Sequence, residues 1–136
     1  MHSFVALDHV LIAIPPDSER RAREFYVDVL GLTEVPRAES LGGRGGGWFA
    51  SGGVSIHLGV DPAFSAADKA HVALLVTSLP ALVARCSAAG CEIWHDVPIP
   101  GFKRAHLRDP FGNRLELMER EPRSEEPAAE GDPARG

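Results

Sequence analysis

Apolar residues along the chain follow two different periods, and the period changes at turn signals. In residues 7–14, LDHVLIAI, the side chains of Val10, Ile12 and Ile14 fall on one face, which is typical of a half-buried strand. In the segment that follows, apolar residues recur at helical spacing up to Gly31, a residue type that commonly ends a helix. The pattern therefore predicts a strand followed by an amphipathic helix.

Three strand-like pieces, LTEVP, GGWFA and VSIHLGV, come next, and the same order then starts again at residue 71. The strand HVALLV leads into a second helix, TSLPALVARCSAAG, with Ser78 as the expected cap and Gly90 at its end. The pieces CEIWHD, FKRAHLR and NRLELME complete this half. The element order of the first half is thus repeated.

Position-by-position matches support this repeat. Gly31, Gly53 and His57 recur 59 positions later as Gly90, Gly112 and Glu116. We therefore expect an α+β fold of two βαβββ modules, about residues 5–60 and 70–119, which form a cupped mixed sheet with the helices on its outer face. A single domain over residues 1–120 and a disordered acidic tail over residues 121–136 complete the predicted organisation.

Alternation along the strands places four polar side chains on the sheet face that points away from the helices. They are His9, His57, His71 and Glu116. Three imidazoles and one carboxylate form a ligand set suited to a divalent ion such as Zn²⁺, Ni²⁺, Co²⁺, Mn²⁺ or Fe²⁺. The alternative is a group of hydrogen-bonded pocket residues without a metal.

The turn DPFGN allows a prediction about His106. A hairpin that is symmetric about Phe111 pairs His106 with Glu116 and Arg108 with Arg114. From there His106 can orient the Glu116 carboxylate or transfer a proton. A pocket-wall histidine without a chemical role is the alternative.

Two further groups of residues are candidates for substrate binding. Lys103, Arg104 and Arg108 are three cations near the last hairpin of an acidic protein, and we expect one of them to bind an anionic group; a solvated strand face is the alternative. Trp48, together with Trp94, is a candidate for an aromatic binding groove, and both are equally compatible with core packing.

Charge and composition exclude several classes of protein. A net charge of −5 over 136 residues argues against a nucleic-acid surface, and no apolar run has the length of a membrane span. The N-terminus lacks a signal sequence, so we expect a cytoplasmic protein. Cys86 and Cys91 are predicted to be free thiols.

The sequence resembles the vicinal oxygen chelate superfamily, which includes glyoxalase I, fosfomycin-resistance thiol transferases, extradiol dioxygenases and bleomycin-resistance proteins. The stretches that carry the resemblance are LDHVLIAI, FYVDVLGL, AHVALLV and DPFGNRLELME, within about residues 5–119. The resemblance implies a metal held by His9, His57, His71 and Glu116, with Glu116 as a candidate catalytic base. His57 departs from the pattern, because glyoxalase I has Glu or Gln at that position, and this weakens a mechanism with two carboxylates.

Two functions follow from the resemblance. The first is a metal-dependent enzyme that acts on a small oxygenated or electrophilic substrate, as a lyase, isomerase, transferase or ring-opening dioxygenase. The alternative is a metal-free binding protein of the bleomycin-resistance type that sequesters a small toxic molecule. In both cases we expect a homodimer, since one pair of modules leaves sheet edges and a half-open cup.

Overall fold

The computed structural model describes residues 2–41 and 43–123. Most of the predicted tail, residues 124–136, and Gly42 lie outside the described residues. None of the helices within the described ranges has the length and apolar character needed to cross a membrane.

The first module forms a four-stranded sheet with one helical layer. Its elements are β1 (Val10–Ile14), α1 (Glu19–Arg23), the π-helical continuation η1 (Glu24–Val29), β2 (Thr33–Val35), the 3₁₀ turn η2 (Glu39–Leu41), β3 (Gly47–Ser51) and β4 (Val54–Val60). The strands lie in the order β1-β4-β3-β2, with β1 parallel to β4 and the other pairs antiparallel.

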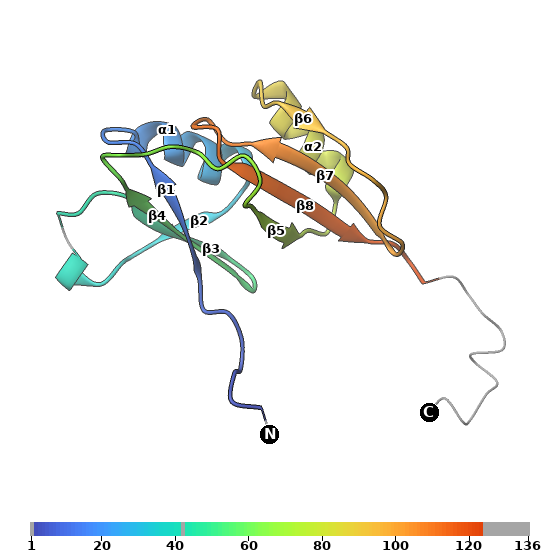
Figure 1. Cartoon of the computed structure of the whole chain (residues 1–136), viewed down its shortest axis with the longest axis horizontal. Helices are drawn as coiled ribbons and strands as arrows, with labels where there is room; N and C mark the ends of the chain where they lie inside the picture. Colours follow the sequence, from blue (N-terminus) through green and yellow to red (C-terminus); the bar gives the residue numbers. More distant parts are fainter. Residues whose placement is uncertain (1, 42, 124–136) are drawn as a thin grey trace.

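The second module repeats this plan. Its elements are β5 (Val72–Leu75), α2 (Leu79–Ala88), β6 (Ile93–Trp94), β7 (Phe102–Arg108) and β8 (Arg114–Arg120). The strand order is β5-β8-β7-β6, again with the first and last strands parallel. The predicted α+β fold of two βαβββ modules is confirmed, and each module forms its own mixed sheet, with both helices on the upper side in Figure 1.

The buried core lies between the sheets and the helices, as the alternation of apolar residues predicts. Ile12, Ile14 and Ile56 of the first module and Leu115 and Leu117 of the second are almost completely buried. Because these side chains occupy one face of each strand, the intervening residues are left on the opposite face. The free thiols are also confirmed, and burial raises the pKa of the Cys86 thiol to about 11.

The start of α2 differs from the expectation. Ser78 occupies the N-cap position, but its side chain makes no capping hydrogen bond. The Leu79 N–H instead donates to Oε1 of Glu119 at 2.7 Å. Glu119 lies on β8, so the sheet supplies the acceptor that the local sequence was expected to provide.

A buried hydrogen-bond network joins the two modules at the turn between β7 and β8. The Tyr26 hydroxyl donates to Oδ2 of Asp109 at 2.7 Å, and the Asn113 side-chain amide donates to the same oxygen and to the Ala13 carbonyl. Burial, and then the neighbouring Asp109 charge, raise the pKa of Tyr26 well above its ordinary value. Tyr26 therefore remains a neutral donor that anchors the turn to the first helix.

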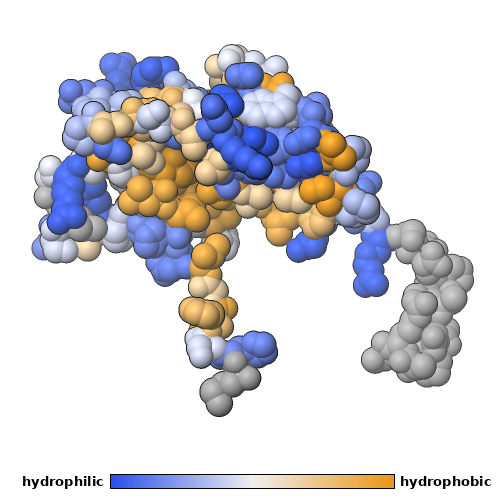
Figure 2. Space-filling view, viewed as in Figure 1, coloured by the Kyte–Doolittle hydropathy of each residue, from blue (hydrophilic) through white to orange (hydrophobic). Residues whose placement is uncertain are grey.

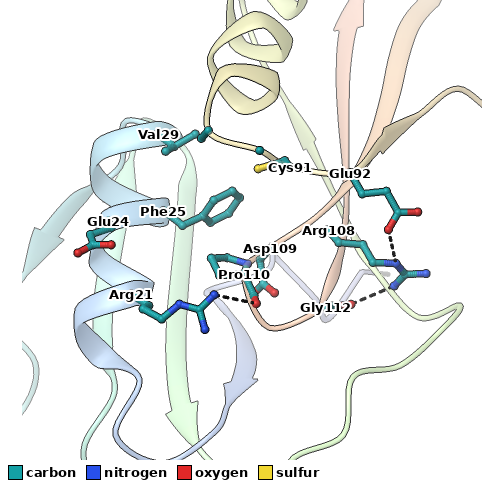
Figure 3. A pocket seen from close by; sticks show the side chains of 12 residues that line it. Arg21, Glu24, Phe25, Val29, Cys91, Glu92, Arg108, Asp109, Pro110 and Gly112 are labelled. Carbon is teal, nitrogen blue, oxygen red and sulfur yellow. Dashed lines mark hydrogen bonds and ion pairs between the residues drawn. The ribbon is translucent and has the colours of Figure 1, made fainter.

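A hollow of about 610 Å³ lies at this junction, and Figure 3 shows Phe25 and Cys91 lining it. Its arginines contact the chain itself: Arg21 donates to the Pro110 carbonyl, and Arg108 donates to the Gly112 carbonyl at 2.9 Å. These contacts hold the turn in place, so we interpret the hollow as part of the module junction.

Candidate metal centre

A row of polar side chains crosses the second sheet on the face opposite α2. Trp94 on β6 pairs with His106 on β7, and His106 pairs with Glu116 on β8. The predicted register of the hairpin, with His106 opposite Glu116 and Arg108 opposite Arg114, is confirmed. The turn DPFGN therefore fixes which side chains meet on this face.

His71, His106 and Glu116 bring one donor atom each to within 4.8 Å of one another. His71 Nε2 lies 2.9 Å from Glu116 Oε1, while its Nδ1 lies 2.7 Å from the Lys69 carbonyl oxygen. A carbonyl only accepts, so Nδ1 carries the hydrogen and Nε2 faces the carboxylate. A favourable contact between this nitrogen and the carboxylate then requires a cation between them, either a proton or a metal ion.

Arg104 supplies a positive charge to the same group. Its Nη1 lies 3.2 Å from Glu116 Oε2 and 3.1 Å from His106 Nε2. Its Nε and Nη2 donate to the Val97 carbonyl, and the side chain is only 12% exposed. The sequence assigned Arg104 to substrate binding, but its contacts are with the candidate metal ligands themselves.

The protonation states suit metal ligation. Burial by itself raises the pKa of Glu116, but hydrogen bonds from His71 and Arg104 outweigh it, so the pKa lies below its ordinary value. For His106, burial lowers the pKa; the Glu116 charge opposes this, whereas Arg114 and Arg104 add to it. Glu116 is therefore a carboxylate and His106 a neutral imidazole, the forms that bind metal.

His9 and His57 lie apart from this group and form a stack with Trp48. The His9 and His57 rings are 3.8 Å apart at 15°, and the Trp48 ring lies 4.1 Å from His57 at 6°. His9 also pairs with Asp8 at 2.9 Å. Stacked rings direct their in-plane nitrogens along parallel planes, so these two imidazoles do not converge on one ion in this arrangement.

The four predicted ligands are therefore divided in the single chain. His71 and Glu116 belong to the close group, which His106 joins, and among the residues that the structure describes this group does not include His9 or His57. The sequence had placed His106 next to the metal and not among its ligands. Its position directly opposite Glu116 was the signal for the closer role.

The remaining candidates fall on both sides of β7. Lys103 pairs with Glu119 and is exposed on the face of α2, whereas Arg108 lies on the face of the candidate centre. Arg114, which the sequence used only to set the hairpin register, brings Nη2 to 3.4 Å from His106 Nδ1. The predicted pairing of Arg114 with Arg108 across the hairpin could have identified Arg114 as a candidate site residue.

Comparison with known proteins identifies relatives of the whole fold. The family model described as Glyoxalase/Bleomycin resistance protein/Dioxygenase superfamily matches residues 6–117. A crystal structure of a glyoxalase family protein from Bacillus anthracis is 38% identical and covers 89% of this chain and 100% of that chain, with a TM-score of 0.83. Among curated proteins there is no match.

Two more distant structures share the fold. TnmS3, an antibiotic binding protein from Streptomyces sp. CB03234, is 22% identical over 87% of this chain and 100% of that chain, with a TM-score of 0.65. The fosfomycin resistance protein FosX from Listeria monocytogenes is 15% identical over 90% of this chain and 96% of that chain, with a TM-score of 0.66. At these identities the likeness concerns the fold alone.

Proposed function

Because the chain belongs to the glyoxalase/bleomycin resistance protein/dioxygenase superfamily, we propose that it is a divalent-metal-dependent enzyme acting on a small oxygenated or electrophilic substrate. The observation that carries the proposal is the convergence of His71, His106 and Glu116 on one face of the second sheet. Two imidazoles and one carboxylate suit Zn²⁺, Ni²⁺, Co²⁺, Mn²⁺ or Fe²⁺.

The residues present fit such an ion. The Lys69 carbonyl fixes the His71 ring so that Nε2 is directed toward Glu116, which is the backbone support that metal-ligating histidines usually have. Glu116 is 5% exposed and ionised, and a cationic nitrogen of Arg104 already lies between it and His106. The group is therefore arranged to hold a positive charge.

A bound metal supplies Lewis-acid polarisation of a substrate oxygen. The chain itself supplies the groups that move protons. Glu116 is the candidate base because its carboxylate stays ionised despite burial. The neutral His106 has one lone-pair nitrogen, which serves either as a metal ligand or as a proton acceptor. At 1% exposure, the His106 ring also keeps water from this side of the group.

Titration calorimetry with Zn²⁺ and Co²⁺ on protein first dialysed against a chelator tests the proposal. We expect one ion per chain, with affinity reduced at least tenfold in His71→Ala and Glu116→Gln because each loses a ligand. His2→Ala is the matched control, since it removes an exposed imidazole outside the group. No binding by the wild type, or equal affinity in all variants, would contradict the proposal.

Two observations favour the alternative, a metal-free protein that binds a small molecule. Arg104 satisfies Glu116 without any metal, and the stacked rings of Trp48 and His57 provide an aromatic surface. Under this alternative the same calorimetry detects no metal. An Arg104→Met variant then loses stability because Glu116 is left buried without a full complement of partners.

A further inference from the structure

Two arginines face each other beside the candidate metal centre. Arg108 on β7 and Arg114 on β8 are directly opposite partners, and alternation places both on the face that carries His106 and Glu116. Like charges in directly opposite positions destabilise a sheet. A negative charge close to the pair would compensate for this repulsion. The net negative charge of the chain does not by itself place one there.

Arg108 finds this compensation within the chain. Its Nε lies 3.9 Å from Glu92, its Nη1 donates to the Gly112 carbonyl at 2.9 Å, and its guanidinium lies 5.3 Å from the centre of the Trp94 ring. The carboxylate, the carbonyl and the aromatic face together stabilise this cation.

Arg114 is left with weaker partners. Its guanidinium lies 5.5 Å from the centre of the Trp94 ring. Its Nη1 lies 3.4 Å from the Asp68 carbonyl oxygen, which is a long hydrogen bond. Within residues 2–41 and 43–123 no carboxylate lies within 4.0 Å of it, and its Nε is buried without a hydrogen-bond partner. A guanidinium has five N–H donors, and the two contacts that Arg114 makes through Nη1 and Nη2 are both as long as 3.4 Å.

His106 cannot satisfy both arginines that approach it. Its Nε2 lies 3.1 Å from Arg104 Nη1, and its Nδ1 lies 3.4 Å from Arg114 Nη2. A neutral imidazole accepts at only one nitrogen, so the other N–H faces a guanidinium N–H. The carboxylate of Asp96 lies 4.0 Å from Nε2 and does not separate these donors. An acceptor oxygen between Arg114 and His106 would satisfy both.

We propose that Arg114, with His106 and Arg108 beside it, binds the oxyanion of a small acidic ligand, a carboxylate or phosphonate group. This inference rests on the proposed function and deepens it, because it names the chemical class of the substrate. The oxyanion neutralises the pair of opposed arginines and accepts from the Arg114 donors that lack a partner. The rest of such a substrate then extends along the sheet toward His71 and Glu116.

Trp94 provides a direct readout, because Arg108 and Arg114 both lie against its ring. A Trp48→Phe background leaves Trp94 as the single tryptophan. In this background, chelator-dialysed protein is titrated with methylphosphonate and with acetate at low ionic strength. We expect a saturable change in fluorescence, and an affinity at least tenfold weaker in Arg114→Gln, because a hydrogen-bonded charge partner is lost.

Arg20→Gln is the matched control, since it removes one positive charge from a side chain that is 93% exposed and paired with Glu24 on the same helix. Its affinity should equal that of the background protein. Saturation by one anion alone supports the proposal and identifies the group as phosphonate or carboxylate. A change that does not saturate, or equal weakening by Arg114→Gln and Arg20→Gln, overturns it.

The two proposals fail differently. If the wild-type protein binds the anion but binds no Zn²⁺ or Co²⁺ in calorimetry, the oxyanion site is supported and the metal-dependent function is contradicted. If the wild-type protein binds metal and Arg114→Gln leaves the anion affinity unchanged, the metal-dependent function is supported and the oxyanion site is contradicted.

Discussion

Arg104 is the residue whose position most affects the candidate centre. Its Nη1 contacts Glu116 and His106 at 3.2 and 3.1 Å, where an ion would need the same donor atoms. The sequence did not distinguish Arg104 from the two other candidate cations, Lys103 and Arg108. Alternation predicts the strand face on which a side chain lies, but not which groups a long side chain contacts. A metal ion and Arg104 therefore compete for one carboxylate.

Replacing Arg104 by methionine tests this competition. We expect tighter binding of Zn²⁺ and Co²⁺, by about tenfold, because the ion no longer has to displace a charged hydrogen-bond partner of Glu116. Titration calorimetry measures the effect. Lys103→Met is the control, since it removes the neighbouring charge from the opposite, exposed side of β7. Weaker binding in Arg104→Met would show that Arg104 positions Glu116 for the metal.

At the scale of elements, helix α2 depends on the sheet on which it packs. Leu79 N–H donates to Glu119 on β8 at 2.7 Å, whereas Ser78 makes no side-chain cap. A carboxylate at a helix N-terminus is favourable both as an acceptor and through the helix dipole. The contact also connects α2 with the strand that carries Glu116.

Denaturant unfolding of two alanine variants separates the two caps. Glu119→Ala should lower the free energy of unfolding by about 1 kcal/mol, the usual cost of a lost helix cap. Ser78→Ala should change it by only a few tenths of a kcal/mol, within the range of surface substitutions. A larger loss in Ser78→Ala than in Glu119→Ala would mean that the serine caps the helix in solution.

At the scale of the whole molecule, a continuous apolar surface remains exposed. Figure 2 shows an orange band that runs from the N-terminal arm onto the body. Phe4 and Val5 of the arm are 96% and 99% exposed, and Leu11 on β1 and Leu75 on β5 are 63% and 52% exposed. Apolar surface of this kind, next to the edge strands β1 and β5, is typical of an interface.

We therefore predict a symmetric dimer, in which the first module of one chain lies against the second module of its partner. Light scattering should give twice the mass of one chain at micromolar concentration, and Leu75→Asp should shift it toward the monomer because a charge would be buried in the interface. Val97→Asp is the control, as Val97 is an exposed apolar residue on a loop outside this surface. A wild-type monomer would contradict the prediction.

The two modules and the faces of their strands can be inferred from the amino-acid sequence alone. Alternation placed Ile12 and Leu115 in the core, and the turn DPFGN paired His106 with Glu116, because both depend on residues close together in the chain. The repeat of 59 positions also indicated that the two modules share one βαβββ plan. These features are local, so they can be inferred without knowing how the modules pack.

The three-dimensional packing, in contrast, was needed to show which of the predicted side chains meet. It divided His71 and Glu116 from the stacked pair His9 and His57, because that division depends on the placement of one module against the other. It also placed Arg104 between Glu116 and His106, since three-dimensional reach and competing hydrogen-bond partners determine where a long side chain ends. Spacing in the sequence carries no record of either.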